Sequence, residues 1–320
     1  MGLVRDFLPA LKYGNKILES EIQGGVNVFS DVWYVDGDNG SDSDTGVDPE
    51  HAFATIQAGI DAASSQDTVY IRTLAPDADA SEPGTYEEDL SIPYAKHGLS
   101  LIGVGATNAL QPFGGPKVKN ATATALLDVK ASNVYIKGLQ FNCTRNSGTY
   151  GIRLQGIAGY ATLAGSVGTV IEDCYFKNAS ATYGGIYVYG GYEVRISRCT
   201  FHLGTNALGV IFHSATVPNN GHLIEYSNFK SNNGAVVTLH LNLASSKDIM
   251  VDHCNFDQAT TFITCVDGAE GLISNCCFND GSTTTVANSS GKIEIPAAND
   301  ELSLTGCYGG GGALIACSGG

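Results

Sequence analysis

The chain has 320 residues, of which 43% are hydrophobic and 15% are charged, with 40 glycines against 9 prolines. This composition excludes a disordered chain and a helical coiled coil, because both need far more charge. Seventeen Lys and Arg against 32 Asp and Glu give a formal charge of -15. The excess of negative charge provides no electrostatic basis for binding nucleic acid or anionic lipid.

The first 31 residues carry scattered apolar side chains, such as Phe7 and Leu8, without enough of them to form a core. We therefore expect residues 1–31 to be a docking segment that anchors a separate domain, residues 32–320, to another protein. The apolar run at the start is interrupted by charged residues and proline, which makes it a poor secretory signal and predicts synthesis in a cytosol. No stretch approaches the ~18 consecutive apolar residues of a membrane helix, so we expect no membrane insertion.

A short acidic loop follows, with aspartates at Asp36, Asp38, Asp42 and Asp44. Carboxylates on such a loop suit a hard cation like Ca²⁺, and these four residues are the candidate metal ligands. The loop lacks EF-hand spacing, since the twelfth position counted from Asp36 is Val47 rather than glutamate. A turn leading into the next element explains the same residues, and we expect no cofactor.

A helix is predicted over about residues 51–63. Phe53, Ile56, Ile60 and Ala63 follow one another at the spacing of a single apolar helix face. Such a helix has one face to bury, so we expect it to cover the end of the structure that follows it.

Most of the remaining chain is a repeat. The shared pattern is an aliphatic residue, two variable residues, Cys or another small or apolar residue, one variable residue and Phe. The pattern occurs in residues 134–141, 170–176, 194–201, 223–229, 249–256 and 272–278, with weaker copies at 101–104 and 304–307. Its aliphatic anchors at 101, 136, 171, 196, 224, 251, 273 and 304 are spaced by 22 to 35 residues. A fixed motif with a variable period indicates a constant structural rung joined by loops of different length.

A second apolar stretch lies between successive motifs, as in Leu126–Val129 and Gly151–Leu154. Each coil is therefore predicted to contribute at least two short strands separated by Gly, Asn and Ser turns. Stacking about eight coils ~4.8 Å apart makes a rod of roughly 40 Å whose core consists of ladders of identical side chains. We expect the nine cysteines to be reduced and mostly buried, because they show no zinc-site or CxxC spacing.

The opening of the domain carries a recognisable pattern. Trp33-Tyr-Val-Asp36-Gly-Asp-Asn-Gly, followed by Phe53-Ala-Thr-Ile56-Gln and then by the repeat, resembles proteins of the pectin-lyase-like superfamily. The resemblance implies an all-β fold, a right-handed single-stranded parallel β-helix with a short N-terminal capping helix. It does not specify chemistry, because this fold hosts lyases, hydrolases, esterases and inert virion proteins.

The two variable residues of each motif should point outward and stack from coil to coil. In four adjacent coils these pairs are Glu172-Asp173, Ser197-Arg198, Glu225-Tyr226 and Asp252-His253. Carboxylates one coil apart would lie about 5 Å from each other and two coils apart about 10 Å, a range that includes glycosidase separations. Like charges that close would raise one pKa, as a general acid requires. The candidate catalytic residues are therefore Glu225, Asp252, Asp173 and His253; the alternative is an ordinary solvated face.

The segment Val251–Cys254 is also similar to the Ile-Asp-His segment of pectate lyases. That family needs an arginine base on a neighbouring coil, whereas the next coil, residues 272–281, contains no Lys or Arg. The polygalacturonase motifs Asn-Thr-Asp and Gly-His-Gly are absent as well.

Two classes of function are open. The resemblance to phage spike, fibre and capsid-decoration proteins implies a structural or adhesive virion protein, homotrimeric, made in the host cytoplasm, bound to other virion proteins through residues 1–31 and contacting host-surface glycans. The alternatives are a polysaccharide lyase or glycoside hydrolase, and a bacterial surface adhesin module.

Overall fold

The structure is a computed structural model that describes most of the repeat region and the capping region. The described residues are 16–17, 30–76, 84–105, 115–119, 125–143, 150–155, 166–180, 184–189, 191–205, 209–212, 219–231, 237–241, 246–257, 261–265, 270–279, 286–287, 293–294 and 302–309. Most of the predicted docking segment, 1–15 and 18–29, lies outside them. Among the described residues, no helix combines the length and apolar character that a membrane crossing requires.

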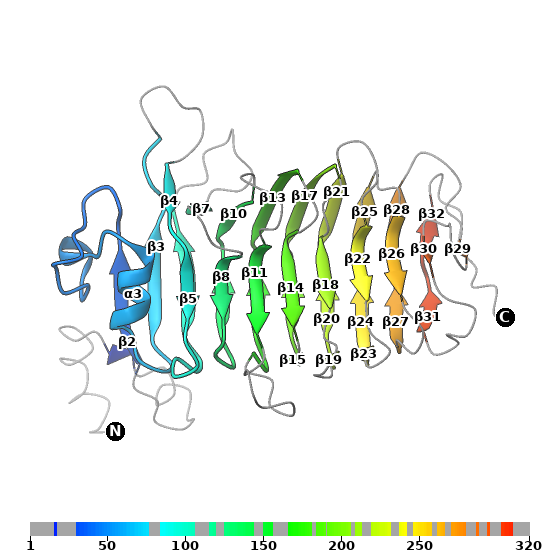
Figure 1. The fold of residues 1–320 in the computed structure, drawn as a ribbon, viewed down its shortest axis with the longest axis horizontal. Coiled ribbons are helices and arrows are strands. Elements are labelled where there is room, and N and C mark those ends of the chain that lie inside the picture. The colour runs from blue at the N-terminus through cyan, green and yellow to red at the C-terminus, as the bar shows by residue number, and fades with distance from the viewer. Residues whose placement is uncertain are drawn as a thin grey trace, which may run out of the picture.

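The described chain winds as a right-handed parallel β-helix, whose coils stack along one axis (Figure 1). Each full coil contributes one strand to each of three long sheets, called sheets I, II and III here. Sheet I comprises, in spatial order, β1 (Lys16–Ile17), β2 (Ser30–Val35), β3 (Thr68–Arg72), β6 (Ser100–Val104), β9 (Tyr135–Lys137), β12 (Val170–Glu172), β16 (Arg195–Ser197), β20 (Leu223–Glu225), β24 (Ile249–Asp252), β27 (Gly271–Ser274) and β31 (Leu302–Thr305).

Sheets II and III run beside it with the same coil order. Sheet II comprises β4 (Thr85–Glu87), β7 (Lys117–Lys119), β10 (Gln140–Asn142), β13 (Tyr175–Ser180), β17 (Thr200–Thr205), β21 (Asn228–Ser231), β25 (Asn255–Asp257), β28 (Cys277–Asn279) and β32 (Tyr308–Gly309). Sheet III comprises β5 (Leu90–Ile92), β8 (Ala125–Val129), β11 (Tyr150–Gln155), β14 (Ile186–Tyr189), β18 (Val210–Phe212), β22 (Val237–Leu241), β26 (Thr261–Cys265), β30 (Ile293–Glu294) and β29 (Val286–Ala287). A small sheet joins β15 (Gly191–Tyr192), β19 (Asn219–Asn220) and β23 (Ser246–Lys247).

The predicted ladders form the core. The motif phenylalanines on sheet II stack ring on ring at centroid distances of 4.6 to 5.1 Å and are fully buried: Phe141, Phe176, Phe201, Phe229, Phe256 and Phe278. The aliphatic anchors of the repeat all lie in sheet I. The first of these anchors, Leu101, is in β6, so strands β2 and β3 come before the repeat begins. Burying each such side chain stabilises the fold by about 1.5–3 kcal/mol, and only a neighbouring coil provides the contact.

The motif cysteines form another inward ladder and carry no disulfide. Cys174, Cys199, Cys254, Cys276 and Cys307 are buried free thiols. Burial raises the pKa of the Cys199 thiol well above its usual value, so the thiol stays protonated and unreactive. The prediction of buried core thiols is confirmed for these residues, whereas the adjacent Cys277 is exposed.

Sheets I and II meet at a tight corner, called the I–II corner here. One residue per coil adopts a positive φ there: Gly138, Asp173, Arg198, Tyr226, His253, Asn275 and Gly306. Side chains other than glycine rarely adopt this conformation. Stacking stabilises it, since the N–H groups of Arg198 and Tyr226 each donate to a carbonyl of the next coil at 3.1 Å. The corner therefore fixes a row of outward side chains, one per coil.

The N-terminal end of the β-helix is covered by a helix shorter than the predicted 51–63. The helix α3 spans Ile56–Ala62, and a 3-10 turn η1 occupies Pro49–His51. Between them Phe53 forms a bridge with Val35, and the Thr55 side chain accepts from the N–H of Ala58, so the helix begins after Thr55. Both Ile56 and Ile60 are buried beneath it, as the apolar face requires.

Candidate functional site

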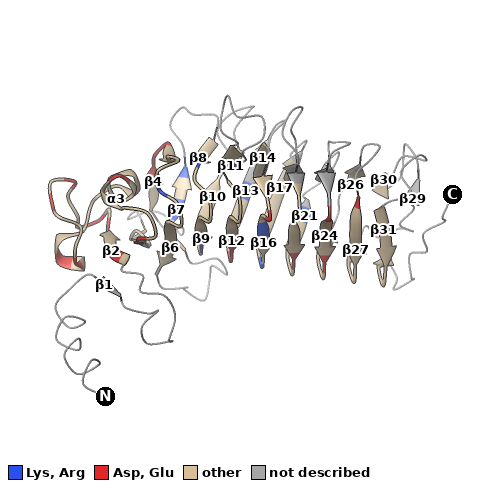
Figure 2. Ribbon diagram, turned by 90° about the horizontal axis from the view of Figure 1, so that it is seen from below, with Lys and Arg blue, Asp and Glu red and all other residues tan. Residues whose placement is uncertain are grey.

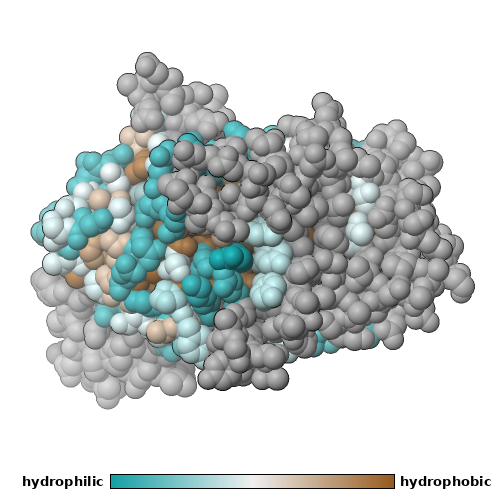
Figure 3. Space-filling model, in the orientation of Figure 1, coloured by the Kyte–Doolittle hydropathy of each residue, from teal (hydrophilic) through white to brown (hydrophobic). Residues whose placement is uncertain are grey.

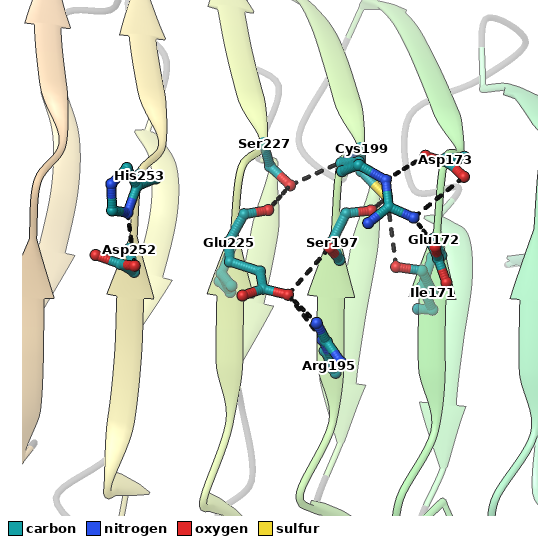
Figure 4. A network of polar contacts seen from close by, with 12 residues as sticks. Ile171, Glu172, Asp173, Arg195, Ser197, Cys199, Glu225, Ser227, Asp252 and His253 are labelled. Atoms are coloured by element: carbon teal, nitrogen blue, oxygen red, sulfur yellow. Dashed lines mark hydrogen bonds and ion pairs between the residues drawn. The ribbon is translucent and has the colours of Figure 1, made fainter.

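The four predicted catalytic residues lie together along the I–II corner (Figure 4). In sheet I the last outward position of each coil is in register, and it holds Lys137, Glu172, Ser197, Glu225, Asp252 and Ser274. Asp173 and His253 are the corner residues of their coils. The sequence thus placed these residues on one edge correctly, because one register relates every coil.

The carboxylates at this edge are paired with basic side chains, which the sequence pattern did not anticipate. Arg198 forms an ion pair with Glu172, and its Nε donates to Asp173 Oδ1 at 2.8 Å. Lys137 Nζ lies 3.6 Å from Glu172 Oε1 and 3.5 Å from Asp173 Oδ2. Figure 2 shows a basic residue of β16 in blue, beside strands whose ends carry acidic residues in red. Basic side chains therefore neutralise the carboxylates of β12 and its corner, while Glu225 and Asp252 are register partners on adjacent coils, as predicted.

Glu225 is held in the same way. Its Oε1 accepts from Arg195 Nε at 2.8 Å and from Ser197 Oγ at 3.1 Å, and the side chain is 12% exposed. A carboxylate fixed by a guanidinium and a hydroxyl stabilises the corner.

Asp252 is the centre of a second set of hydrogen bonds. Its Oδ1 accepts from Ser274 Oγ at 2.6 Å and from Asn275 Nδ2 at 3.0 Å, and its Oδ2 lies 2.7 Å from His253 Nδ1. Burial alone would raise the pKa of Asp252, but these hydrogen bonds outweigh it and lower the pKa. Asp252 therefore stays ionised, contrary to the raised pKa expected of a general acid.

The order of these contacts also excludes a serine-nucleophile arrangement at this point. Ser274 and His253 both contact Asp252, so the histidine is not bonded to the hydroxyl that it would have to deprotonate. The His253 ring instead stacks on Tyr226 with centroids 5.1 Å apart, and Tyr226 is 53% exposed. This end of the corner presents aromatic surface to solvent.

The acidic loop is bound by donors of the protein itself. Asp36 pairs with Arg72, Asp38 Oδ2 accepts from the N–H of Ala75 at 2.7 Å, and Asp42 Oδ1 accepts from the N–H groups of residues 54 and 55, each at 2.9 Å. Within the described part of the chain, no group of three or more His, Cys, Asp or Glu side chains could hold a metal ion. Asp36, Asp38 and Asp42 thus tie the loop to the capping region, and Asp44 lies in a turn where its N–H donates to the Ser41 carbonyl at 2.9 Å.

A polar cluster on sheet III was missed by the sequence analysis. Arg153 on β11 lies in register with Asp128 on β8, and its Nε and Nη2 donate to the two Asp128 oxygens at 2.9 Å each. Gln155 Nε2 lies 2.7 and 2.8 Å from the same two oxygens, and Lys130 Nζ lies 3.7 Å from Oδ2. The Asp128 side chain is 15% exposed and that of Arg153 29% exposed, so the group, with one carboxylate and two cationic side chains, lies at the surface.

Tyrosines border this group on the next coil. Tyr187 and Tyr189 of β14 are in register with Arg153 and Gln155, and Tyr187 also lies 4.4 Å from Tyr150 between ring centroids. The Tyr187 and Tyr189 rings are stacked at 6.0 Å. This face is directed at the viewer in Figure 3, where its described part includes a strongly hydrophilic patch. We call Asp128, Arg153, Gln155, Tyr187 and Tyr189 the sheet III cluster.

The signal for this cluster was present in the sequence. Leu127-Asp128-Val129 and Ile152-Arg153-Leu154 both alternate apolar, charged and apolar residues, which places the charged side chain on the outer face of a strand. Both stretches were predicted as apolar strands, and their outward side chains meet because β8 and β11 lie in register on adjacent coils.

Comparison with known proteins agrees with the coil geometry. The protein family described as "Right handed beta helix region" matches residues 128–302. The chain belongs to this family. No curated protein matches the chain.

Several solved structures share the fold of this β-helix family member. A pectin methylesterase from Aspergillus niger is 15% identical with a TM-score of 0.54, over 90% of this chain and 87% of that one. The pectate lyase Pel9A is 12% identical with a TM-score of 0.57, over 88% of this chain and 70% of that one. A lacto-N-biosidase from Eubacterium ramulus is 9% identical with a TM-score of 0.51, over 87% of this chain and 55% of that one. Identities this low establish a shared fold and carry no residue roles.

Proposed function

We propose that the protein binds an extended polysaccharide on the outer face of sheet III and does not cleave it. The observation that carries the proposal is the sheet III cluster, in which Asp128, Arg153 and Gln155 form a hydrogen-bonded set beside two tyrosine rings. Sugar hydroxyls both donate and accept, so they suit a carboxylate, a guanidinium and an amide held side by side. Tyrosine faces supply the apolar surface against which a sugar ring packs.

Binding fits these carboxylates better than cleavage does. Both Asp128 oxygens accept from Arg153 and Gln155, and Glu225 and Asp252 are engaged by Arg195 and Ser274. Glycoside hydrolysis needs one carboxyl group that gives a proton and a second that acts as base or nucleophile. Carboxylates whose oxygens already accept hydrogen bonds from the protein's own donors are not placed to provide such an acid.

The setting that we propose is a bacteriophage virion, with the protein as a homotrimeric spike, fibre or decoration component anchored through residues 1–31. Its support is the resemblance of the opening motif and the repeat to such proteins. The unbridged thiol ladder adds to it, because buried reduced cysteines fit synthesis in a reducing cytoplasm. Light scattering of the full-length protein should give three times the monomer mass at all concentrations, and a monodisperse monomer would refute the trimer.

The binding proposal is tested with the full-length protein on an array of bacterial surface polysaccharides and pectins, followed by calorimetry on the best ligand. Arg153→Met and Tyr189→Ala should each weaken binding by roughly tenfold or more. Arg195→Met is the matched control, since Arg195 makes an equivalent ion pair on another face. Equal loss in Arg153→Met and Arg195→Met would assign the effect to folding and refute the site.

A polysaccharide-cleaving enzyme is the second candidate. It is favoured by the surface contact of Asp252 with His253, and by the fold that the chain shares with a pectin methylesterase and a pectate lyase. Release of reducing ends or of unsaturated products from the bound polysaccharide would support it. Glu225→Gln and Asp252→Asn should then abolish the release, and unchanged release would remove these residues from the reaction.

A further inference from the structure

A pocket of about 540 Å³ opens on the outer face of sheet I at its N-terminal end, apart from the sheet III cluster. Its walls come from β2, β3 and β6 and from η1, and the residues that matter for the argument are Tyr34, Tyr70, Val104, Asp36 and Arg72. The volume is that of a small-molecule site. No residue of this pocket takes part in the proposed polysaccharide site.

Two tyrosines form the main wall. Tyr34 and Tyr70 are register partners on β2 and β3, with ring centroids 6.1 Å apart and planes tilted by 34°. Val104, at the end of β6, is 40% exposed. Aromatic faces and an exposed aliphatic side chain leave apolar surface in contact with water, which a ligand with an apolar face would cover.

The polar side of the pocket is an ion pair. Asp36 and Arg72 are in contact, and the Asp36 side chain is 11% exposed whereas that of Arg72 is 53% exposed. Asn39 Nδ2 donates to Asp36 at 3.1 Å, and Tyr86 Oη donates to the Arg72 carbonyl at 2.7 Å, so both residues are held in place. Because the guanidinium has five N–H donors, donors remain for a ligand at its exposed side.

We propose that this pocket binds a single pyranose unit of an uncharged sugar, with the sugar ring against Tyr34 and Tyr70 and its hydroxyl groups on Arg72 and Asp36. An ion pair that is already balanced offers no net charge to an anion, and the chain as a whole carries -15. A purely apolar ligand would cover the ion pair without replacing its water contacts, which is costly. A sugar has both an apolar ring face and hydroxyl groups that donate and accept.

The test is saturation-transfer NMR and calorimetry on the full-length protein. The probes are methyl β-D-glucopyranoside and methyl β-D-galactopyranoside, with glucuronic acid and indole as the charged and apolar comparisons. We expect at least one methyl glycoside to bind with a Kd on the order of 1 mM. Absence of binding by both methyl glycosides, or tighter binding of glucuronic acid or indole, would overturn the inference.

Variants locate the bound sugar. Tyr70→Ala and Arg72→Met should each weaken the binding by roughly tenfold, whereas Tyr226→Ala, which removes an exposed tyrosine elsewhere, is the matched control. Because Tyr70 and Tyr189 lie on different sheets, loss confined to Tyr70→Ala assigns the sugar to this pocket. Loss confined to Tyr189→Ala would assign it to the sheet III cluster and overturn the inference, while leaving the proposed function intact.

Discussion

The buried histidine of β-helix coil 219–231 makes the stability of the protein depend on pH. His222 is 1% exposed, and its Nδ1 accepts from the N–H of Val194 at 3.2 Å, so the ring is neutral in the folded protein. Burial lowers the pKa of His222 to about 3. In the unfolded chain the pKa is about 6.5, so below that pH the unfolded state binds a proton that the folded state does not.

The sign and size of the effect follow directly. Stability from this group is fully present above pH ~6.5 and falls as the pH drops toward 3. Between pH 7 and pH 5 the contribution of His222 to the free energy of unfolding should decrease by about 2 kcal/mol, from ~1.4 kcal/mol for each pH unit below 6.5. That is a large part of a typical total of 5–15 kcal/mol. The carboxylates with lowered pKa, Asp36 and Asp252, titrate below this window.

The measurement is guanidinium denaturation at pH 7 and pH 5 for the wild type and for His222→Asn. Asparagine keeps an oxygen acceptor for the Val194 N–H but does not titrate. The variant is expected to be less stable at pH 7, because it leaves a small cavity, and to lose almost nothing more at pH 5. If His222→Asn lost as much stability as the wild type between the two pH values, the reasoning would be refuted.

Two further predictions concern the ladders. Phe201→Ala should lower the free energy of unfolding by about 3–5 kcal/mol, since Phe201 stacks on Phe176 at 4.8 Å and on Phe229 at 4.6 Å. Tyr226→Ala at the surface should change the free energy of unfolding by about 0.5 kcal/mol or less. Similar losses of stability for both variants in urea denaturation would contradict a core built from the phenylalanine stack. Maleimide labelling of the native protein, mapped by peptide mass spectrometry, should modify Cys277 and leave the buried ladder cysteines unmodified until denaturant is added. Labelling of the ladder cysteines in the native protein would contradict this prediction, because it would show that the coils open.

The sequence was sufficient for the β-helix and its inward ladders. The spacing from aliphatic residue to Cys to Phe is fixed within each motif, so alternate burial follows from the geometry of a strand and its corner. The apolar spacing of Phe53, Ile56 and Ile60 likewise predicted the capping element. Its start could not be predicted from this spacing, because Phe53 pairs with β2 and the N–H groups of Ile56 and Gln57 donate to Glu88, and these contacts depend on the folded end of the solenoid.

Which polar groups meet was decided by the tertiary structure. Loops of different length separate the coils, so the sequence distance from Glu225 to Arg195, or from Arg153 to Asp128, carries no signal of its own. Only the register between coils brings these side chains together. The sequence therefore determined which residues point outward. The stacking of coils determined their partners: the hydrogen bonds from Ser274 and Asn275 lower the pKa of Asp252, and Arg153 meets Asp128 in the sheet III cluster.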